Sequence, residues 1–116
     1  SIAGTIDMVY KKPNGELFIF DWKRTTKLVN DIGTIIKSDF EYGYDELENL
    51  SNNSYNKYCL QQNLYKYILE DNYGEKVSSM NILVLHPRYH TYFHLQVPNL
   101  IKETEFLIRK AREKSI

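Results

Sequence analysis

The sequence lacks several features that would place it in a special class of protein. It has a single cysteine, Cys59, which alone cannot form an internal disulfide, complete a zinc site or hold an iron–sulfur cluster. No apolar run approaches the roughly 18 residues of a membrane span, and no signal peptide is evident. There is also no internal repeat or low-complexity tract. We therefore expect a folded intracellular domain with no membrane partner and no iron–sulfur cluster.

The sequence also lacks an excess of charge of either sign. Its 15 basic and 15 acidic residues give a formal net charge of zero. This removes the bulk basic excess that often marks a nucleic-acid-binding protein, so any such site must be local. The balance hides an asymmetry, because residues 1–53 hold 6 basic and 9 acidic residues and residues 54–116 hold 9 and 6.

What is present is ordinary globular composition in a chain long enough for one core. The 116 residues are 42% hydrophobic and 26% charged, which favours a single folded domain over disorder. The chain begins Ser-Ile-Ala-Gly, without an initiator methionine, and strand-like sequence follows at once. We expect residues 1–116 to be one domain of a longer protein, so that elements upstream of Ser1 are missing.

The first 23 residues have the pattern of a β-hairpin. Residues 2–12 and 16–23 are rich in Ile, Val, Phe, Tyr and Trp, and a Lys-Pro-Asn-Gly-Glu sequence lies between them. Pro13 and Asn14 suit the central positions of a type I turn, and Gly15 suits the left-handed position after it. This turn fixes the register, so that the numbers of each facing pair add to 28.

The predicted register separates the hairpin into two chemically different faces. One face is continuously apolar, with Tyr10 opposite Phe18, Met8 opposite Phe20 and Ile6 opposite Trp22. The other places Val9 opposite Ile19, Asp7 opposite Asp21 and Thr5 opposite Lys23. Two carboxylates and a lysine therefore lie together on one face.

The remaining sequence predicts a long loop followed by two helices and two strands. Residues 25–53 lose periodicity and carry five acids between positions 39 and 48, so we expect a mobile loop with a short strand at 32–36. Helical spacing of apolar residues predicts a helix over 54–73, capped by Ser54 and ended by Gly74. Two further strands are expected at 80–86 and 90–97, and a closing helix capped by Asn99 through Lys114.

The facing carboxylates need compensation. Directly opposite residues of a hairpin have Cβ atoms roughly 5 Å apart, and like charges so placed destabilise a sheet. A divalent cation satisfies Asp7 and Asp21, because Mg²⁺ prefers oxygen ligands and often uses only one or two protein carboxylates. Lys23 lies on the same face, where its ammonium can stabilise charge or orient a water molecule. The simpler alternative is a surface salt-bridge cluster at the end of a hairpin.

Three short motifs occur in order along the chain. They are Gly-x-x-Asp at 4–7, Asp-x-Lys at 21–23 after an apolar run, and Gln-x-x-x-Tyr at 61–65 on one face of the predicted helix. Each is weak alone, but the ordered set resembles the PD-(D/E)XK nuclease superfamily, specifically its RecB-like exonuclease branch. The resemblance covers roughly residues 2–70, with a longer loop before the helix than the family has. It implies an α/β fold with a central mixed sheet flanked by helices.

The resemblance also implies a set of roles for individual residues. Asp7 and Asp21 would bind Mg²⁺ or Mn²⁺, with the backbone carbonyl of Trp22 as a further ligand, and Lys23 would assist the attacking water. Gln61 would help to position Lys23 or the scissile phosphate. Such a site has the chemistry that phosphodiester hydrolysis needs, without a covalent nucleophile.

The partners expected from the resemblance are nucleic acid and other protein domains. Tyr65 would contact the nucleic-acid backbone. We expect a metal-dependent, exonuclease-like enzyme acting on DNA, either single strands or duplex ends, within a replication, repair or mobile-element protein.

Two alternatives remain open on the sequence. Family members normally have a helix and a glutamate before the Gly-x-x-Asp motif, and neither precedes Ser1 in this sequence. A catalytically inactive PD-(D/E)XK-like module that binds nucleic acid or serves a structural role is therefore one alternative. The other is an unrelated α/β interaction domain with a chance motif.

Overall fold

The computed structural model describes residues 8–36 and 54–114. This part of the chain forms an α/β fold in which two helices accompany a four-stranded mixed sheet. The predicted α/β class with a mixed sheet is thus confirmed. The elements, in chain order, are β1 (Met8–Lys11), β2 (Leu17–Arg24), α1 (Ser54–Tyr73), β3 (Val77–Leu85), β4 (Phe93–Gln96) and α2 (Ile101–Lys114).

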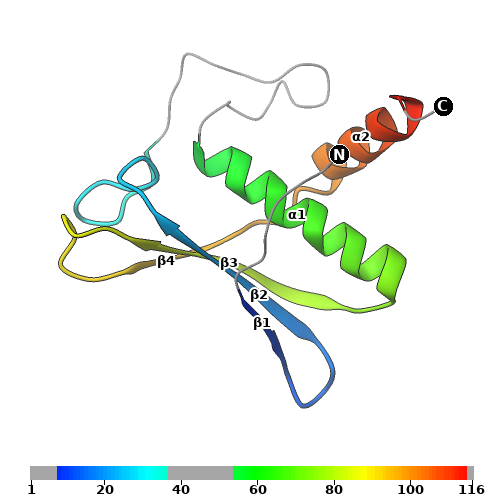
Figure 1. The fold of residues 1–116 in the computed structure, drawn as a ribbon, viewed down its shortest axis with the longest axis horizontal. Coiled ribbons are helices and arrows are strands. Elements are labelled where there is room, and N and C mark those ends of the chain that lie inside the picture. The colour runs from blue at the N-terminus through cyan, green and yellow to red at the C-terminus, as the bar shows by residue number, and fades with distance from the viewer. Residues whose placement is uncertain (1–7, 37–53, 115–116) are drawn as a thin grey trace.

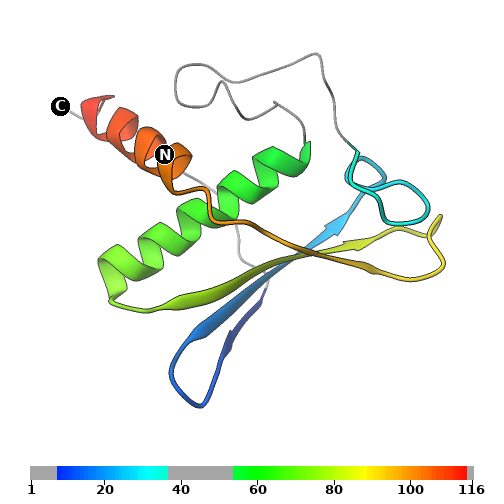
Figure 2. The ribbon, with the colours of Figure 1, turned by 180° about the vertical axis from the view of Figure 1, so that it is seen from behind.

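The strands lie side by side in the order β1-β2-β3-β4. The pairs β1–β2 and β3–β4 are antiparallel, whereas β2 and β3 are parallel. A parallel pair needs a crossover connection, and α1 is the helix in that connection. In Figures 1 and 2, α1 lies across one face of the sheet and α2 packs against α1 on the same side.

The β1–β2 hairpin has the predicted turn and register. Gly15 has φ of 91°, its N–H bonds the Lys12 carbonyl at 2.8 Å, and the Lys12 N–H bonds the Glu16 carbonyl at 2.8 Å. Four observed pairs have the predicted sum of 28, namely Met8 with Phe20, Val9 with Ile19, Tyr10 with Phe18 and Lys11 with Leu17. Residues 1–7 lie outside the described part, so the structure does not test the predicted pairing of Asp7 with Asp21.

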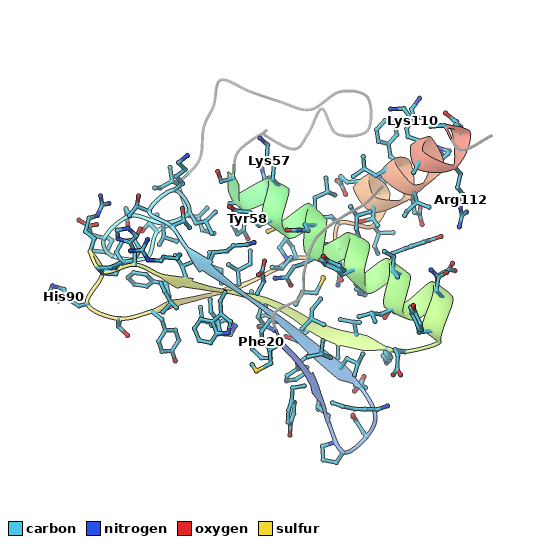
Figure 3. All side chains as sticks on the ribbon, in the orientation of Figure 1. Phe20, Lys57, Tyr58, His90, Lys110 and Arg112 are labelled. Carbon is cyan, nitrogen blue, oxygen red and sulfur yellow. The ribbon has the colours of Figure 1, made fainter. Side chains whose placement is uncertain are left out.

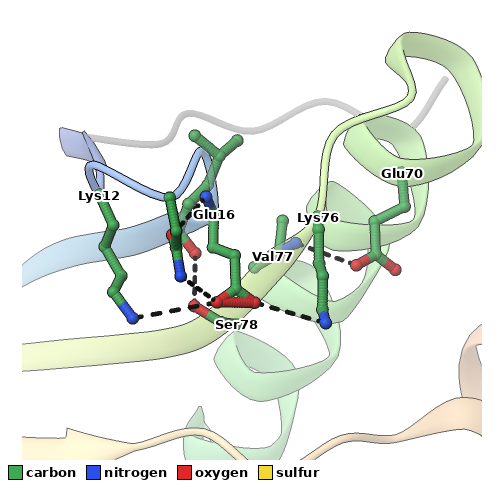
Figure 4. A network of polar contacts seen from close by, with 8 residues as sticks. Lys12, Glu16, Glu70, Lys76, Val77 and Ser78 are labelled. Carbon is green, nitrogen blue, oxygen red and sulfur yellow. Dashed lines mark hydrogen bonds and ion pairs between the residues drawn. The ribbon is translucent and has the colours of Figure 1, made fainter.

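A polar network fastens the start of β2 to the start of β3 (Figure 4). The Glu16 carboxylate lies 3.4 Å from Lys76 Nζ and 3.9 Å from Lys12 Nζ. Beside it, the Glu70 carboxylate at the end of α1 accepts a hydrogen bond from the Val77 N–H at 3.0 Å. The network ties the hairpin turn to the chain that leaves α1, which helps to fix β2 against β3.

The segment after β2 is more ordered than the expected loop. Leu28 and Val29 are fully buried, and the Tyr89 hydroxyl donates a hydrogen bond to the Val29 carbonyl at 2.6 Å. The predicted strand at 32–36 is wrong, because Ile35 forms only an isolated bridge with Val29 and Ile32 is exposed. Residues 37–53 of the predicted loop lie outside the described residues.

The helices and the last two strands agree with the sequence patterns in kind. The bounds of α1 are those predicted, and Gly74 follows it with φ of 67°. The expected N-cap of α2 is wrong by one residue, because the Leu100 carbonyl accepts the Thr104 N–H and the Asn99 side chain instead accepts a hydrogen bond from Lys66. Strand β3 begins three residues before its predicted start, and β4 begins three residues after its own.

The core lies between α1 and the sheet. We call the side of the sheet under α1 the covered face and the opposite side the outer face. On the covered face of the two central strands, Ile19, Ile82 and Val84 are fully buried. The outer face carries Met8, Tyr10, Phe18, Phe20 and Trp22, of which Met8, Tyr10 and Trp22 are exposed. Neither described helix is long and apolar enough to cross a membrane.

Candidate active site

The residues with the clearest chemistry in the described structure are Asp21 and Lys23 on β2. Because side chains alternate along a strand, residues two apart share a face, and Asp21 lies two positions beyond the core residue Ile19. Asp21 is only 4% exposed, and its Oδ2 lies 3.0 Å from Lys23 Nζ. The sequence prediction that this carboxylate and this amine lie together on one face is confirmed. They form an ion pair on the covered face.

Helix α1 contacts this pair through Tyr58. The Lys23 Nζ lies over the face of the Tyr58 ring, 4.3 Å from its centroid. Figure 3 shows Tyr58 on the α1 side of the sheet and Phe20 on the opposite side. The Lys23 side chain is therefore held between a carboxylate of its own strand and an aromatic ring of the crossover helix, while 23% of it stays exposed.

One turn after Tyr58, Gln62 joins the helix to β3. Gln62 is 2% exposed, and its Nε2 donates a hydrogen bond of 2.6 Å to the Asn81 carbonyl. Asn81 pairs with Phe20, the residue immediately before Asp21. The Gln62 Oε1 is buried and accepts no hydrogen bond from the residues described. A buried acceptor of this kind is normally satisfied by a donor such as an ordered water molecule.

The predicted roles of Gln61 and Asp7 both remain predictions. Gln61 is half-buried on α1, three residues after Tyr58 and so on the same side of the helix. Within residues 8–36 and 54–114 it makes no hydrogen bond with Asp21 or Lys23, so its predicted positioning role stays a prediction. Asp7 lies outside the described residues.

The structure does not test the predicted roles of Trp22 and Tyr65. The Trp22 side chain is 42% exposed and lies on the outer face. The predicted metal ligand is instead its backbone carbonyl, which belongs to β2 between Asp21 and Lys23. Tyr65 packs against the core, and its hydroxyl oxygen is buried. The predicted contact between Tyr65 and a nucleic-acid backbone therefore stays a prediction.

The donor atoms on the covered face suit a hard cation in kind. The Asp21 carboxylate and the Gln62 Oε1 are oxygen atoms buried in the layer between α1 and the sheet, and oxygen is the ligand type that Mg²⁺ and Mn²⁺ prefer. Within residues 8–36 and 54–114, which do not include Asp7, no group of three His, Cys, Asp or Glu side chains could hold a metal ion. A metal at Asp21 would therefore need oxygen ligands beyond these side-chain types or beyond the described residues, such as the Trp22 carbonyl, the Asp7 carboxylate or substrate oxygen atoms.

Beside the site, α1 carries a buried thiol and phenol that interact with each other. Burial raises the pKa of the Cys59 thiol from 9.0 to about 11. Burial, assisted by a hydrogen bond with Cys59, likewise raises the pKa of Tyr55 from 10.0 to about 12. Both groups are neutral at physiological pH, so neither adds charge to the layer that holds Asp21.

Tyr58 and Gln62 are the two site residues that the sequence reasoning missed. A signal existed for Tyr58, because it lies three residues before Gln61 and seven before Tyr65, which is the spacing of one helix face. Gln62 had no such signal, since its role depends on a bond to a backbone carbonyl 19 residues away.

Comparison with known proteins identifies no relative of this chain. The chain gives no significant match to a protein-family model, to a curated protein or to a solved structure.

Proposed function

We propose that the chain is a metal-dependent nuclease domain that hydrolyses DNA phosphodiester bonds, with a PD-(D/E)XK-like core of the RecB-like exonuclease branch. The observation that carries the proposal is the buried Asp21 carboxylate held 3.0 Å from the Lys23 amine on the second strand of the hairpin. The hairpin register of residues 8–20 adds support, because its continuation by one pair is the predicted approach of Asp7 to Asp21.

The residues of this chain have distinct tasks in the proposed reaction. Asp21, with Asp7, would hold Mg²⁺ or Mn²⁺, which when bound supplies a polarised phosphoryl oxygen and an activated water. Lys23 has three N–H donors and uses one toward Asp21. Because its side chain remains 23% exposed, another donor can reach a phosphate oxygen and stabilise the charge that grows there.

A second candidate is a catalytically inactive module of the same core. One observation favours it: Lys23 already balances the charge of Asp21, so the described pair is electrostatically satisfied as a structural ion pair. An inactive protein would keep such a buried pair for its stability alone, because removing either partner leaves the other charge buried and uncompensated. The two candidates differ in whether divalent metal supports cleavage.

The test measures cleavage of end-labelled single-stranded and duplex DNA by the full-length protein with Mg²⁺ or Mn²⁺. EDTA should stop cleavage, and Ca²⁺ should allow binding without cleavage because it activates water poorly. Asp21→Ala should lose detectable cleavage and weaken Mn²⁺ binding. Lys23→Ala should keep Mn²⁺ binding but raise the barrier by about 2–4 kcal/mol, roughly 30- to 1,000-fold in rate.

Matched control variants guard against a general effect of charge. Asp31 has a 71% exposed side chain and pairs with Arg88 at the surface, so Asp31→Ala should cleave like the wild type. Circular dichroism and thermal unfolding must show that the Asp21 and Lys23 variants remain folded. Wild-type cleavage by Asp21→Ala would reject the nuclease assignment. A wild type that binds Mn²⁺ and DNA yet never cuts would favour the inactive module.

A further inference from the structure

The contact between Lys23 and Tyr58 stands out among the cation–aromatic contacts of the described residues. Its distance of 4.3 Å is shorter than the 5.2–5.9 Å of the others. A cation within about 6 Å of a ring centroid is attracted by the negative face of the ring, most strongly where water is excluded. This contact also joins two elements distant in sequence, β2 and α1.

We propose that Tyr58 is a positioning residue for Lys23, acting through the face of its aromatic ring. A lysine side chain has a flexible four-carbon stem, so its amine is costly to hold in one place. Asp21 attracts that amine from the strand, and Tyr58 attracts it from the helix. Together the two contacts fix the position of the ammonium, and its three N–H donors allow a further hydrogen bond to a phosphate oxygen. The catalytic part of this inference rests on the proposed nuclease function, whereas the contact itself does not.

Simple packing is the competing explanation, because Tyr58 also packs against the hydrophobic core. The two explanations differ in which property of the ring matters. Packing depends on size and shape, whereas attraction to a cation depends on the electron density of the ring face. The Tyr58 hydroxyl makes no hydrogen bond within residues 8–36 and 54–114. The Tyr58→Phe substitution should therefore preserve the contact between the ring and Lys23.

The experiment is a graded series at position 58 in the full-length protein. Tyr58→Phe is the reference variant. Phenylalanines that carry one, two or three fluorine atoms on the ring are then incorporated at position 58 by nonsense suppression. Fluorination lowers the electron density of the ring face with little change in shape. A Tyr58→Leu variant removes the ring. Tyr55, which packs against the same core from the same helix, provides the control series.

The expected result is a stepwise fall in kcat along the Tyr58 series, reaching roughly 3- to 30-fold for the trifluorinated ring. KM for DNA and affinity for Mn²⁺ should stay near those of the reference. Tyr58→Phe should match the wild type, and the Tyr55 fluorine series should show no gradient. Equal kcat throughout the Tyr58 series would overturn a positioning role in catalysis.

A second readout does not depend on activity. The Lys23 side-chain protons lie over an aromatic ring, so in NMR spectra of the wild type they should resonate upfield of those of an exposed lysine. This shift should persist in Tyr58→Phe and disappear in Tyr58→Leu. Lys23 resonances that are unchanged in Tyr58→Leu would overturn the proposal whatever the activity. If the shift behaves as expected but the wild type never cleaves DNA, the contact stands and the nuclease function is what fails.

Discussion

The two faces of the sheet differ in a way that their composition does not suggest. On β2, Ile19 and Asp21 of the covered face are 0% and 4% exposed, whereas Trp22 of the outer face is 42% exposed. On β2, the face richer in large aromatic side chains is thus the more open one. The face with a carboxylate and an amine is the one that α1 closes.

The chain connections explain this difference. The β2–α1–β3 crossover lays α1 against one side of the parallel pair, and α2 packs against α1 on that same side (Figure 1). Hydrophobicity along β2 indicates that both sides can be buried, but only the placement of the helices decides which side is. Asp21 is therefore buried because of where α1 lies, and Lys23 supplies the charge that burial requires.

The largest expected effect comes from truncating a covered-face residue. Ile19→Ala should lower the free energy of unfolding by about 2–4 kcal/mol, because it leaves a cavity under α1 where Ile19 is fully buried. Leu85→Ala is the matched control on a neighbouring strand: Leu85 pairs with Arg24 on the outer face and is 39% exposed, so its truncation should cost about 1 kcal/mol. Urea unfolding of both variants measures the difference. Equal costs for the two variants would contradict the assignment of covered and outer faces.

The sequence was sufficient to predict the fold wherever local chemistry decides it. The Pro13-Asn14-Gly15 turn predicted the hairpin register, and helical spacing bounded by Ser54 and Gly74 predicted both ends of α1. It was insufficient for the segment after β2. Leu28 and Val29 are buried there through tertiary contacts, such as the hydrogen bond that the Val29 carbonyl accepts from Tyr89, 60 residues later in the chain. No local periodicity in the sequence predicts this burial.

The candidate site divides in the same way. Asp21 and Lys23 could be predicted to lie together, because two residues of one strand share a face. The contribution of α1 could not, since it depends on the exact rotation of the helix over the sheet. That rotation places Tyr58 on Lys23 and Gln62 on the Asn81 carbonyl, and buries the hydroxyl of Tyr65.

A second prediction uses Cys59, the single cysteine, as a probe of the covered face. Its pKa is raised from 9.0 to about 11 by burial, so at pH 8 the folded protein should hold about a hundredfold less thiolate than the unfolded chain. Reaction with iodoacetamide should be slower in the folded protein by at least that factor. Because folding favours the neutral thiol, the free energy of unfolding should also fall as the pH rises from about 9 to about 11.

The control for this labelling experiment places a thiol on the outer face. In a Cys59→Ala background, Tyr10→Cys should react at nearly the rate of a free thiol, since Tyr10 is 53% exposed. Rapid labelling of Cys59 in the folded protein at pH 8 would show that α1 opens from the sheet far more readily than the packing implies.

The smallest expected effect is that of replacing Tyr10 itself. Its ring is 53% exposed on β1 and makes a tilted contact with Phe18 at 6.4 Å between centroids. Tyr10→Thr keeps a residue that favours strands and loses little buried surface, so the free energy of unfolding should change by less than about 1 kcal/mol. Cleavage should be unaffected, because Tyr10 lies on the face opposite Asp21 and Lys23. Urea unfolding of the full-length protein checks the first expectation, and the labelled-DNA assay checks the second. A loss above about 2 kcal/mol would mean that the outer face is covered in the full-length protein. The difference in exposure between the two faces would then hold only for residues 8–36 and 54–114 taken by themselves.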